Sequence, residues 1–149
     1  MKTKMVAAVC AAAVCTTVLA GCGGGNTPLK DGTYEGKSSV YENDDGTDDG
    51  NGYGVVTLTI KDGEIADCTF KTYEIDGTYK DENYGMEDGR IANKDYYNKA
   101  QKANTARDEY AAQLVQNGQL DGIDVISGAT INYDQFVEAA RAALGEAAG

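Results

Sequence analysis

Apolar and polar residues alternate along residues 53–60, which is the pattern of a half-buried β-strand. One face carries Val56, Leu58 and Ile60, and the other carries Val55, Thr57 and Thr59. The next four residues, Lys61 to Glu64, predict a tight turn, because Gly63 can adopt a positive φ. Residues 65–75 then predict the returning strand of a hairpin. In that strand, alternation places Cys68 on the face of Ala66 and Phe70, which favours a buried small residue over a reactive thiol.

The flanking segments predict one more strand and two loops. Residues 33–41, opened by Asp31-Gly32, have the pattern of a first strand. Residues 42–52 are dense in Asp, Gly and Asn, but an EF-hand that begins at Asp45 places Val56 where a bidentate Glu is needed, so an acidic surface loop is favoured over a weak ion site. Residues 76–90 are polar and rich in Gly and Tyr, which indicates a loop.

The second half of the chain predicts two helices. Residues 95–116 show helical spacing, with Asn117-Gly118 as the C-terminal stop. Its apolar stripe is Tyr97, Ala100, Ala103, Ala106, Tyr110, Leu114 and Val115. A short strand is expected over 123–126, followed by a helix over 133–144 that Asn132 caps, with Gln135 at the capping-box spacing. Together these elements predict a small α+β domain over 31–146, with an antiparallel hairpin packed against helices.

The N-terminus has the features of an export signal. Lys2 and Lys4 precede an uncharged apolar stretch that is short for a permanent membrane span. The sequence Leu19-Ala20-Gly21-Cys22 resembles the lipobox of bacterial lipoproteins, in which the cysteine becomes lipidated at the new N-terminus. We therefore expect a signal peptide over 1–21, a lipidated Cys22 with a flexible tether over 22–30, and a location on the extracytoplasmic face of the cell membrane. The alternative is an ordinary signal peptide with an incidental Cys22.

Charge and composition exclude several classes of function. The chain has 13 basic and 24 acidic residues, a net charge of −11, and no histidine. Such a surface repels nucleic acid. Without an imidazole there is no Ser-His-Asp triad, no His-ligated zinc and no CxxCH haem attachment. Redox chemistry in this chain therefore needs an organic cofactor.

A hydroxyl-bearing, glycine-containing turn precedes the last helix. It reads Asp124-Val125-Ile126-Ser127-Gly128-Ala129-Thr130. The backbone N–H groups and the dipole at a helix N-terminus favour a phosphate, and glycine permits close approach. The residues alone thus predict an anion site, though a simple strand-to-helix turn with Thr130 as a cap would look similar.

This turn resembles the Asp-x-x-Ser-Gly-Ala-Thr motif of the FMN-binding domain family, known from flavinylated subunits of the sodium-pumping NADH:quinone reductase. Asp124, Ser127, Gly128, Ala129 and Thr130 match every specified position. The likeness extends over the 52–65 hairpin, and the 73–80 segment with Lys80 resembles secreted lipoprotein members. The resemblance implies covalent FMN, joined through its phosphate to Thr130 by a dedicated FMN transferase.

The resemblance also implies roles for the other motif residues. Ser127 and the amides of Gly128 and Ala129 would hold phosphate oxygens. Asp124 would serve the transferase or fix the turn through backbone N–H groups. Tyr79, Tyr84, Tyr96 and Tyr97 are candidate platforms for the flavin ring, although each could simply pack the domain.

The function expected from these features is electron transfer and not stand-alone enzymatic turnover. The carrier would take electrons from a quinone-linked dehydrogenase or reductase and pass them to an extracytoplasmic acceptor, with flavin as the redox group. Gly52-Tyr53-Gly54 precedes no helix, so it is no dinucleotide site. The alternatives are a surface-binding or antigenic lipoprotein without flavin, and a flavin-dependent reductase with its own substrate.

Overall fold

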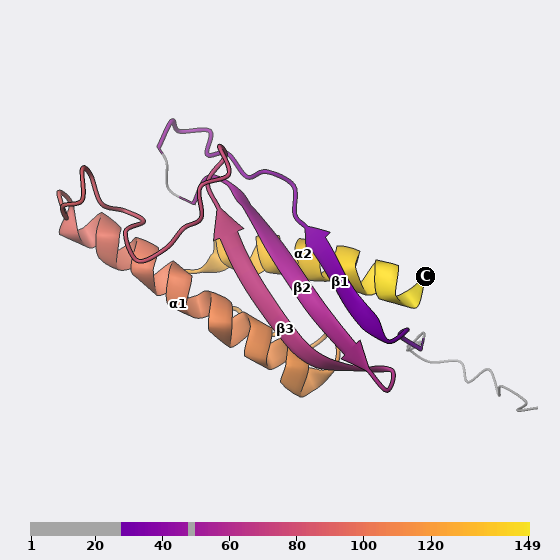
Figure 1. Ribbon diagram of the computed structural model, residues 1–149. Helices are drawn as coiled ribbons and strands as arrows, with labels where there is room; N and C mark the ends of the chain where they lie inside the picture. Colours follow the sequence, from indigo (N-terminus) through magenta and orange to yellow (C-terminus); the bar gives the residue numbers. More distant parts are fainter. Residues whose placement is uncertain (1–27, 48–49) are drawn as a thin grey trace, which may run out of the picture.

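A computed structural model describes residues 28–47 and 50–149 of the chain. The expected signal peptide and Cys22 lie outside the described residues. The elements follow in the order β1 (Gly32–Lys37), β2 (Tyr53–Lys61), β3 (Glu64–Tyr73), α1 (Lys94–Asn117) and α2 (Thr130–Ala148). The strands form one antiparallel sheet in sequence order, and both helices cover the same face of it (Figure 1). This two-layer arrangement confirms the predicted α+β fold.

The predicted hairpin of β2 and β3 is confirmed. Lys61 pairs with Glu64, and the two residues between them both have positive φ, 55° at Asp62 and 77° at Gly63. That combination fits a two-residue turn whose twist matches the strands. A register shift between Thr59 and Ile60 places Ile65, and not Ala66, on the buried face with Cys68. The expectation for Ala66 was wrong because a bulge interrupts the period of two.

The core lies between the sheet and the two helices. The inner face of β2 supplies Val56, Leu58 and Ile60, which are all at most 2% exposed. Helix α2 packs on β1 and β2, and α1 packs on β3. A Cβ on Gly36 of β1 would stand 1.9 Å from the backbone oxygen of Ala139, so the missing side chain permits α2 to lie directly on the strand.

Helix α1 confirms the predicted helix with slightly wider bounds. The side chain of Asn93 accepts a hydrogen bond from the Tyr96 amide, and Gly118 ends the helix with a φ of 68°. The apolar stripe faces the core, with Tyr110 and Leu114 fully buried. Among the described residues, no helix has both the length and the apolar character to cross a membrane.

Several details of the predicted elements were wrong. Strand β1 ends at Lys37, and Tyr41 contributes only an isolated bridge to Gly52. Residues 123–126 form no strand, because the backbone amides of Asp124 and Ile126 donate to the side chains of Gln113 and Tyr110 in α1. Helix α2 begins at Thr130, three residues before the predicted start.

The early start of α2 also removes the predicted capping box. Asn132 lies inside the first turn, where its side-chain amide donates to the Ala103 carbonyl of α1 at 2.7 Å. Gln135 donates instead to the Gly52 carbonyl at 3.1 Å. Both side chains therefore join α2 to other elements, which local sequence spacing does not reveal.

The domain begins before the first strand. The amide of Lys30 donates to the Ala147 carbonyl near the end of α2 at 2.8 Å, and Leu29 packs against the core. These two residues of the expected 22–30 tether thus contact the folded domain.

Candidate functional site

The Ser-Gly-Ala-Thr turn enters helix α2 directly. The Ala129 amide donates to the Ile126 carbonyl at 3.0 Å, which closes the turn, and Gly128 has a φ of 83° that favours glycine. The turn thus brings the chain into α2 with Thr130 as its first helical residue. Its hydroxyl-bearing side chain is exposed.

The N-terminus of α2 has no side-chain cap. Ala129 occupies the N-cap position, and the first backbone bond of the helix runs from the Tyr133 amide to the Ala129 carbonyl. Within the described part of the chain, no hydrogen bond uses the amides of residues 130–132. Three donors and the positive end of the helix dipole are therefore available to an anion.

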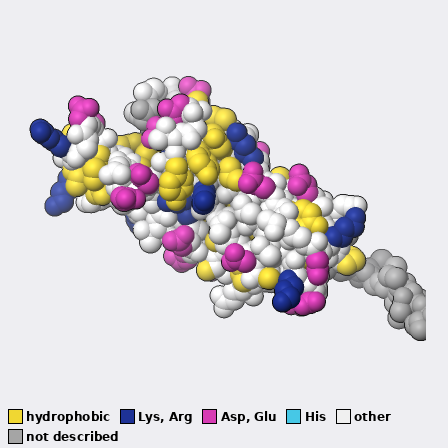
Figure 2. Space-filling view, in the orientation of Figure 1, with side chains coloured by type: hydrophobic (Ala, Val, Ile, Leu, Met, Phe, Trp, Pro, Cys, Tyr) yellow, Lys and Arg dark blue, Asp and Glu magenta, His cyan; other side chains and the backbone are white. Residues whose placement is uncertain are grey.

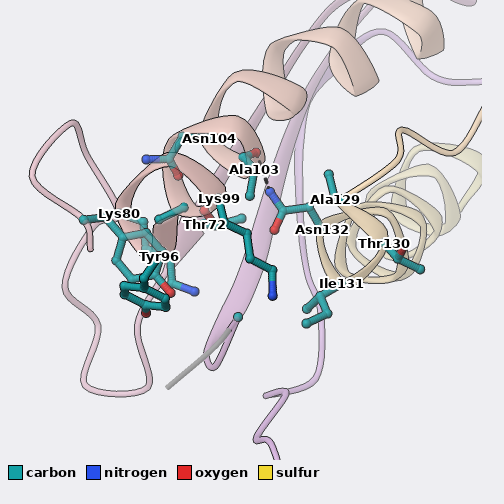
Figure 3. A pocket seen from close by; sticks show the side chains of 14 residues that line it. Thr72, Lys80, Tyr96, Lys99, Ala103, Asn104, Ala129, Thr130, Ile131 and Asn132 are labelled. Carbon is teal, nitrogen blue, oxygen red and sulfur yellow. Dashed lines mark hydrogen bonds between the residues drawn. The ribbon is translucent and has the colours of Figure 1, made fainter. Parts of the chain in front are cut away.

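A cavity of about 200 Å³ adjoins this helix start. Four segments contribute its walls: the end of β3, the 80–84 segment, the first half of α1 and residues 128–132, with Gly50 at one edge. In Figure 3, Lys99 extends between Tyr96 on one side and Ile131 and Asn132 on the other, while Thr130 lies at the rim, on the side of α2 away from Tyr96. The cavity is thus a concave site with the exposed residue Thr130 at its edge.

Lysines gather at this cavity in an otherwise acidic protein. Lys80 and Lys99 line it, and Lys102 lies close enough that its ammonium would be 3.4 Å from a Cβ added to Gly128. Lys80 is 4% exposed and donates to the Asn51 carbonyl at 2.6 Å. On the face shown in Figure 2, both charges are mixed, and hydrophobic side chains gather over the loop end of the sheet and the start of α1. The three lysines make the cavity favourable for an anionic ligand.

Two tyrosines form the aromatic part of the wall. Tyr84 and Tyr96 both line the cavity. Burial, together with the neighbouring Tyr96 hydroxyl, raises the pKa of Tyr84 well above its usual range. The Lys80 ammonium lies 4.6 Å from the Tyr84 ring centroid. Tyr84 therefore stays a neutral phenol and can offer an aromatic face to a ligand.

The other two candidate tyrosines serve the packing of the loop. The Tyr79 ring packs against Tyr73, with centroids 5.6 Å apart, and Arg107 lies over it at 5.1 Å. The Tyr97 hydroxyl donates to the Glu82 carbonyl at 3.1 Å. Neither residue lines the cavity.

The predicted motif residues divide into two groups. Gly128, Ala129 and Thr130 line the cavity, whereas Ser127 and Asp124 do not. The Ala129 amide, expected to hold phosphate, is occupied by the Ile126 carbonyl within the turn. Asp124 is exposed, and its backbone, not its carboxylate, pairs with Gln113.

Sequence reasoning missed the lysines of α1. Lys99 and Lys102 are three residues apart on a polar helix face, which alone indicates only solvent exposure. Their significance arises because α1 passes beside the start of α2, a contact between segments distant in sequence. Lys80 did carry a signal, since it belongs to the 73–80 segment noted above.

The donor set fits a phosphate attached to an apolar or aromatic body. Free helix amides and lysines suit the phosphate, and the cavity adds Tyr84, Tyr96, Ala100, Ala103 and Ile131 for the apolar part. A metal is less well served: within residues 28–47 and 50–149, no group of three His, Cys, Asp or Glu residues could hold an ion.

A second hollow, of about 540 Å³, is also lined by these two tyrosines. It shares Tyr84 and Tyr96 with the cavity, and its charged lining residues are Glu74, Asp76 and Glu87. We call it the acidic groove. The tyrosine pair thus belongs both to the lysine-lined cavity and to the carboxylate-lined groove.

Comparison with known proteins identifies the fold and the family. The crystal structure of the CPE2226 protein from Clostridium perfringens is similar with a TM-score of 0.56 and 23% sequence identity, over 80% of this chain and 88% of that one. A search among curated proteins gives no significant sequence match. The model of the FMN-binding domain matches residues 50–145, which include the hairpin, α1, most of α2 and the residues that line the cavity. This match supports a flavin-binding protein with FMN as its cofactor, and the chain belongs to the FMN-binding domain family.

Proposed function

We propose that this protein is an exported, lipid-anchored electron carrier that holds FMN by a phosphoester on Thr130. One observation carries the attachment site: the Thr130 hydroxyl is exposed at the first residue of an uncapped helix, at the rim of a lysine-lined cavity. The amides of residues 130–132 would hold phosphate oxygens there. Charge-assisted bonds of this kind contribute about 1.5–3 kcal/mol each.

The attachment is a phosphoryl transfer without oxidation or reduction. The Thr130 oxygen bonds to the phosphorus of the FMN phosphate and loses its proton. The bond that breaks is the anhydride bond of a flavin-bearing pyrophosphate donor, whose other half leaves as a monophosphate. An FMN transferase would bind this donor and supply the base that takes the Thr130 proton. Thr130 is accessible to such an enzyme because its side chain is exposed.

The cavity residues would position the cofactor once it is attached. FMN supplies a two-electron redox centre when bound. Lys99 and Lys102 would balance its phosphate charge, while Tyr84, Tyr96 and Ile131 would exclude water from its apolar part. The bond to Thr130 prevents loss of the cofactor by dilution outside the cell.

A carrier also needs a surface that binds its redox partners, and the acidic groove suits a partner with a basic surface. Glu74, Asp76 and Glu87 would attract a partner that presents Lys or Arg, and Tyr84 and Tyr96 line both the groove and the cavity. The expected donor is a quinone-linked dehydrogenase or reductase. A lipid on Cys22 would confine the carrier to the membrane surface and raise its effective concentration near that donor.

Flavin fluorescence under denaturing conditions tests the attachment. We expect the full chain, co-produced with an FMN transferase, to keep fluorescence in a denaturing gel and to gain the mass of FMN less one water. Thr130→Ala should abolish both signals, and Thr130→Ser should retain part of them. The matched control is Thr105→Ala, an exposed helical threonine that does not line the cavity. A fluorescent Thr130→Ala band would place the flavin elsewhere.

The carrier role and the anchor are tested on membranes. Because nothing in the sequence resembles an NADH site, purified flavinylated protein should show negligible reduction by NADH, yet be reduced rapidly in membranes that contain the donor dehydrogenase. Cys22→Ser should release the domain or leave its precursor uncleaved, and should slow that reduction. Reduction by NADH alone at about 1–10³ s⁻¹ would indicate an enzyme instead.

A further inference from the structure

Helix α1 holds the Ser-Gly-Ala-Thr turn through a fully buried tyrosine. The Tyr110 hydroxyl donates to the Ala129 carbonyl at 3.1 Å and accepts from the Ile126 amide at 2.9 Å. It thus bonds both ends of the turn that the Ala129 amide closes onto Ile126. Tyr110 itself is 0% exposed, and its ring stacks on Phe136 with centroids 5.7 Å apart.

A second side chain of α1 holds the start of the motif. The Gln113 side-chain oxygen accepts from the Asp124 amide at 2.7 Å, and its nitrogen donates to the Asp124 carbonyl at 3.4 Å. Gln113 and Tyr110 lie one turn apart on the helix, so they bind successive parts of residues 124–129. The side chains of Asp124 and Ser127 remain exposed.

We infer that Tyr110, assisted by Gln113, is a positioning residue that fixes Thr130 and therefore the bound FMN relative to the cavity. This inference rests on the proposed attachment to Thr130. The same helix supplies both the clamp and the cavity wall with Lys99, Ala100 and Ala103. A rigid link between turn and wall keeps a flavin that is attached at the rim in one orientation.

The tyrosine suits this role because it stays protonated. Burial raises its pKa, so the hydroxyl keeps the proton that it donates to Ala129. Phenylalanine would keep the ring and its stacking on Phe136, but would leave the Ile126 amide and the Ala129 carbonyl without that partner. The substitution therefore separates positioning from packing.

Tyr110→Phe is compared with Tyr133→Phe in the full chain, solubilised in detergent. Tyr133 belongs to the same aromatic cluster, with its ring 5.8 Å from that of Tyr110, but no hydrogen bond from its hydroxyl is found among the described residues. We expect both variants to carry flavin on Thr130. Only Tyr110→Phe should lower flavin fluorescence anisotropy and increase quenching by iodide. In the same variant, the Ile126 amide should also exchange its hydrogen with solvent about 10-fold faster, which corresponds to a loss of about 1.4 kcal/mol in the free energy of local opening.

Each outcome decides the inference. Unchanged anisotropy, quenching and Ile126 exchange in Tyr110→Phe would overturn it. If that variant does not fold, Gln113→Ala is compared with Gln116→Ala, an exposed glutamine of the same helix. An unchanged flavin signal in Gln113→Ala would then overturn the inference. Failure of the proposed function gives a different result from either comparison of variants, because the wild-type protein would then carry no flavin on Thr130.

Discussion

The contact of β1 with α2 gives the strongest stability prediction, because two identical substitutions should have opposite effects. In Gly36→Ala, the new Cβ would lie 1.9 Å from the Ala139 oxygen and 2.5 Å from the Ala143 nitrogen. Both are backbone atoms and cannot rotate away, so α2 must shift. Overpacking of this kind costs about 1–3 kcal/mol. Gly145→Ala, in the same helix α2, meets no atom within 4 Å and should gain about 0.5–1 kcal/mol of helix propensity.

Urea denaturation of both variants, followed by circular dichroism, measures these free energies of unfolding. Gly36→Ala should lower the midpoint and Gly145→Ala should raise it, with similar slopes. In thermal unfolding, Gly36→Ala should lower Tm by roughly 4 °C for each kcal/mol that it removes from the free energy of unfolding. If Gly36→Ala were as stable as Gly145→Ala, α2 would not lie directly on β1, and the close approach would be wrong.

Three further predictions concern single side chains. Burial raises the pKa of Cys68 from 9.0 to about 12, so the thiol should resist labelling at pH 8 in the native protein and react after unfolding. The contribution of this raised pKa to the free energy of unfolding is complete below pH 9 and is lost as the pH rises toward 12. In a Thr130→Ala background, where FMN binds only non-covalently, Lys102→Met should weaken FMN binding about two- to fivefold in a fluorescence titration. Riboflavin binding should not change, because riboflavin has no phosphate. The control variant Lys94→Met should weaken FMN binding less than Lys102→Met does. Asn132→Ala should lower the free energy of unfolding by about 1–3 kcal/mol in urea, because the Ala103 carbonyl loses its side-chain donor; an unchanged midpoint would contradict the bond.

Residue pattern alone specifies the parts of the fold that depend on neighbours along the chain. The alternation of residues 53–60 and the Asp62-Gly63 turn specify a hairpin, since side-chain period and turn conformation are local properties. The spacing of apolar residues along α1 and the glycine at 118 likewise specify that helix and its end. The family motif at 124–130 pointed to the segment that enters α2, and the match to the FMN-binding domain confirms the family.

Predictions from the local residue pattern were wrong where contacts with a segment distant in sequence determine the structure. Residues 123–126 have the composition of a strand, yet their backbone amides bond to the Gln113 and Tyr110 side chains of α1. Asn132 has the identity of a cap, but it lies inside α2 because the Ala103 carbonyl of α1 accepts its side-chain hydrogen bond. The bulge at Thr59 and Ile60 exposes Ala66 for a related reason, since register is set between strands and not within one.

In the candidate site, too, some residues could be identified from the local sequence and others only from contacts between elements. The sequence identified Thr130 as a hydroxyl at a helix start, because motif and chemistry are both local. Only the tertiary structure joined it to Lys99, Lys102 and the Tyr84–Tyr96 pair, and only the packing of α1 against residues 124–129 revealed Tyr110 as the residue that holds the turn. These groups meet because two helices pack on one face of a sheet, and contacts between elements leave no periodic signal in the sequence.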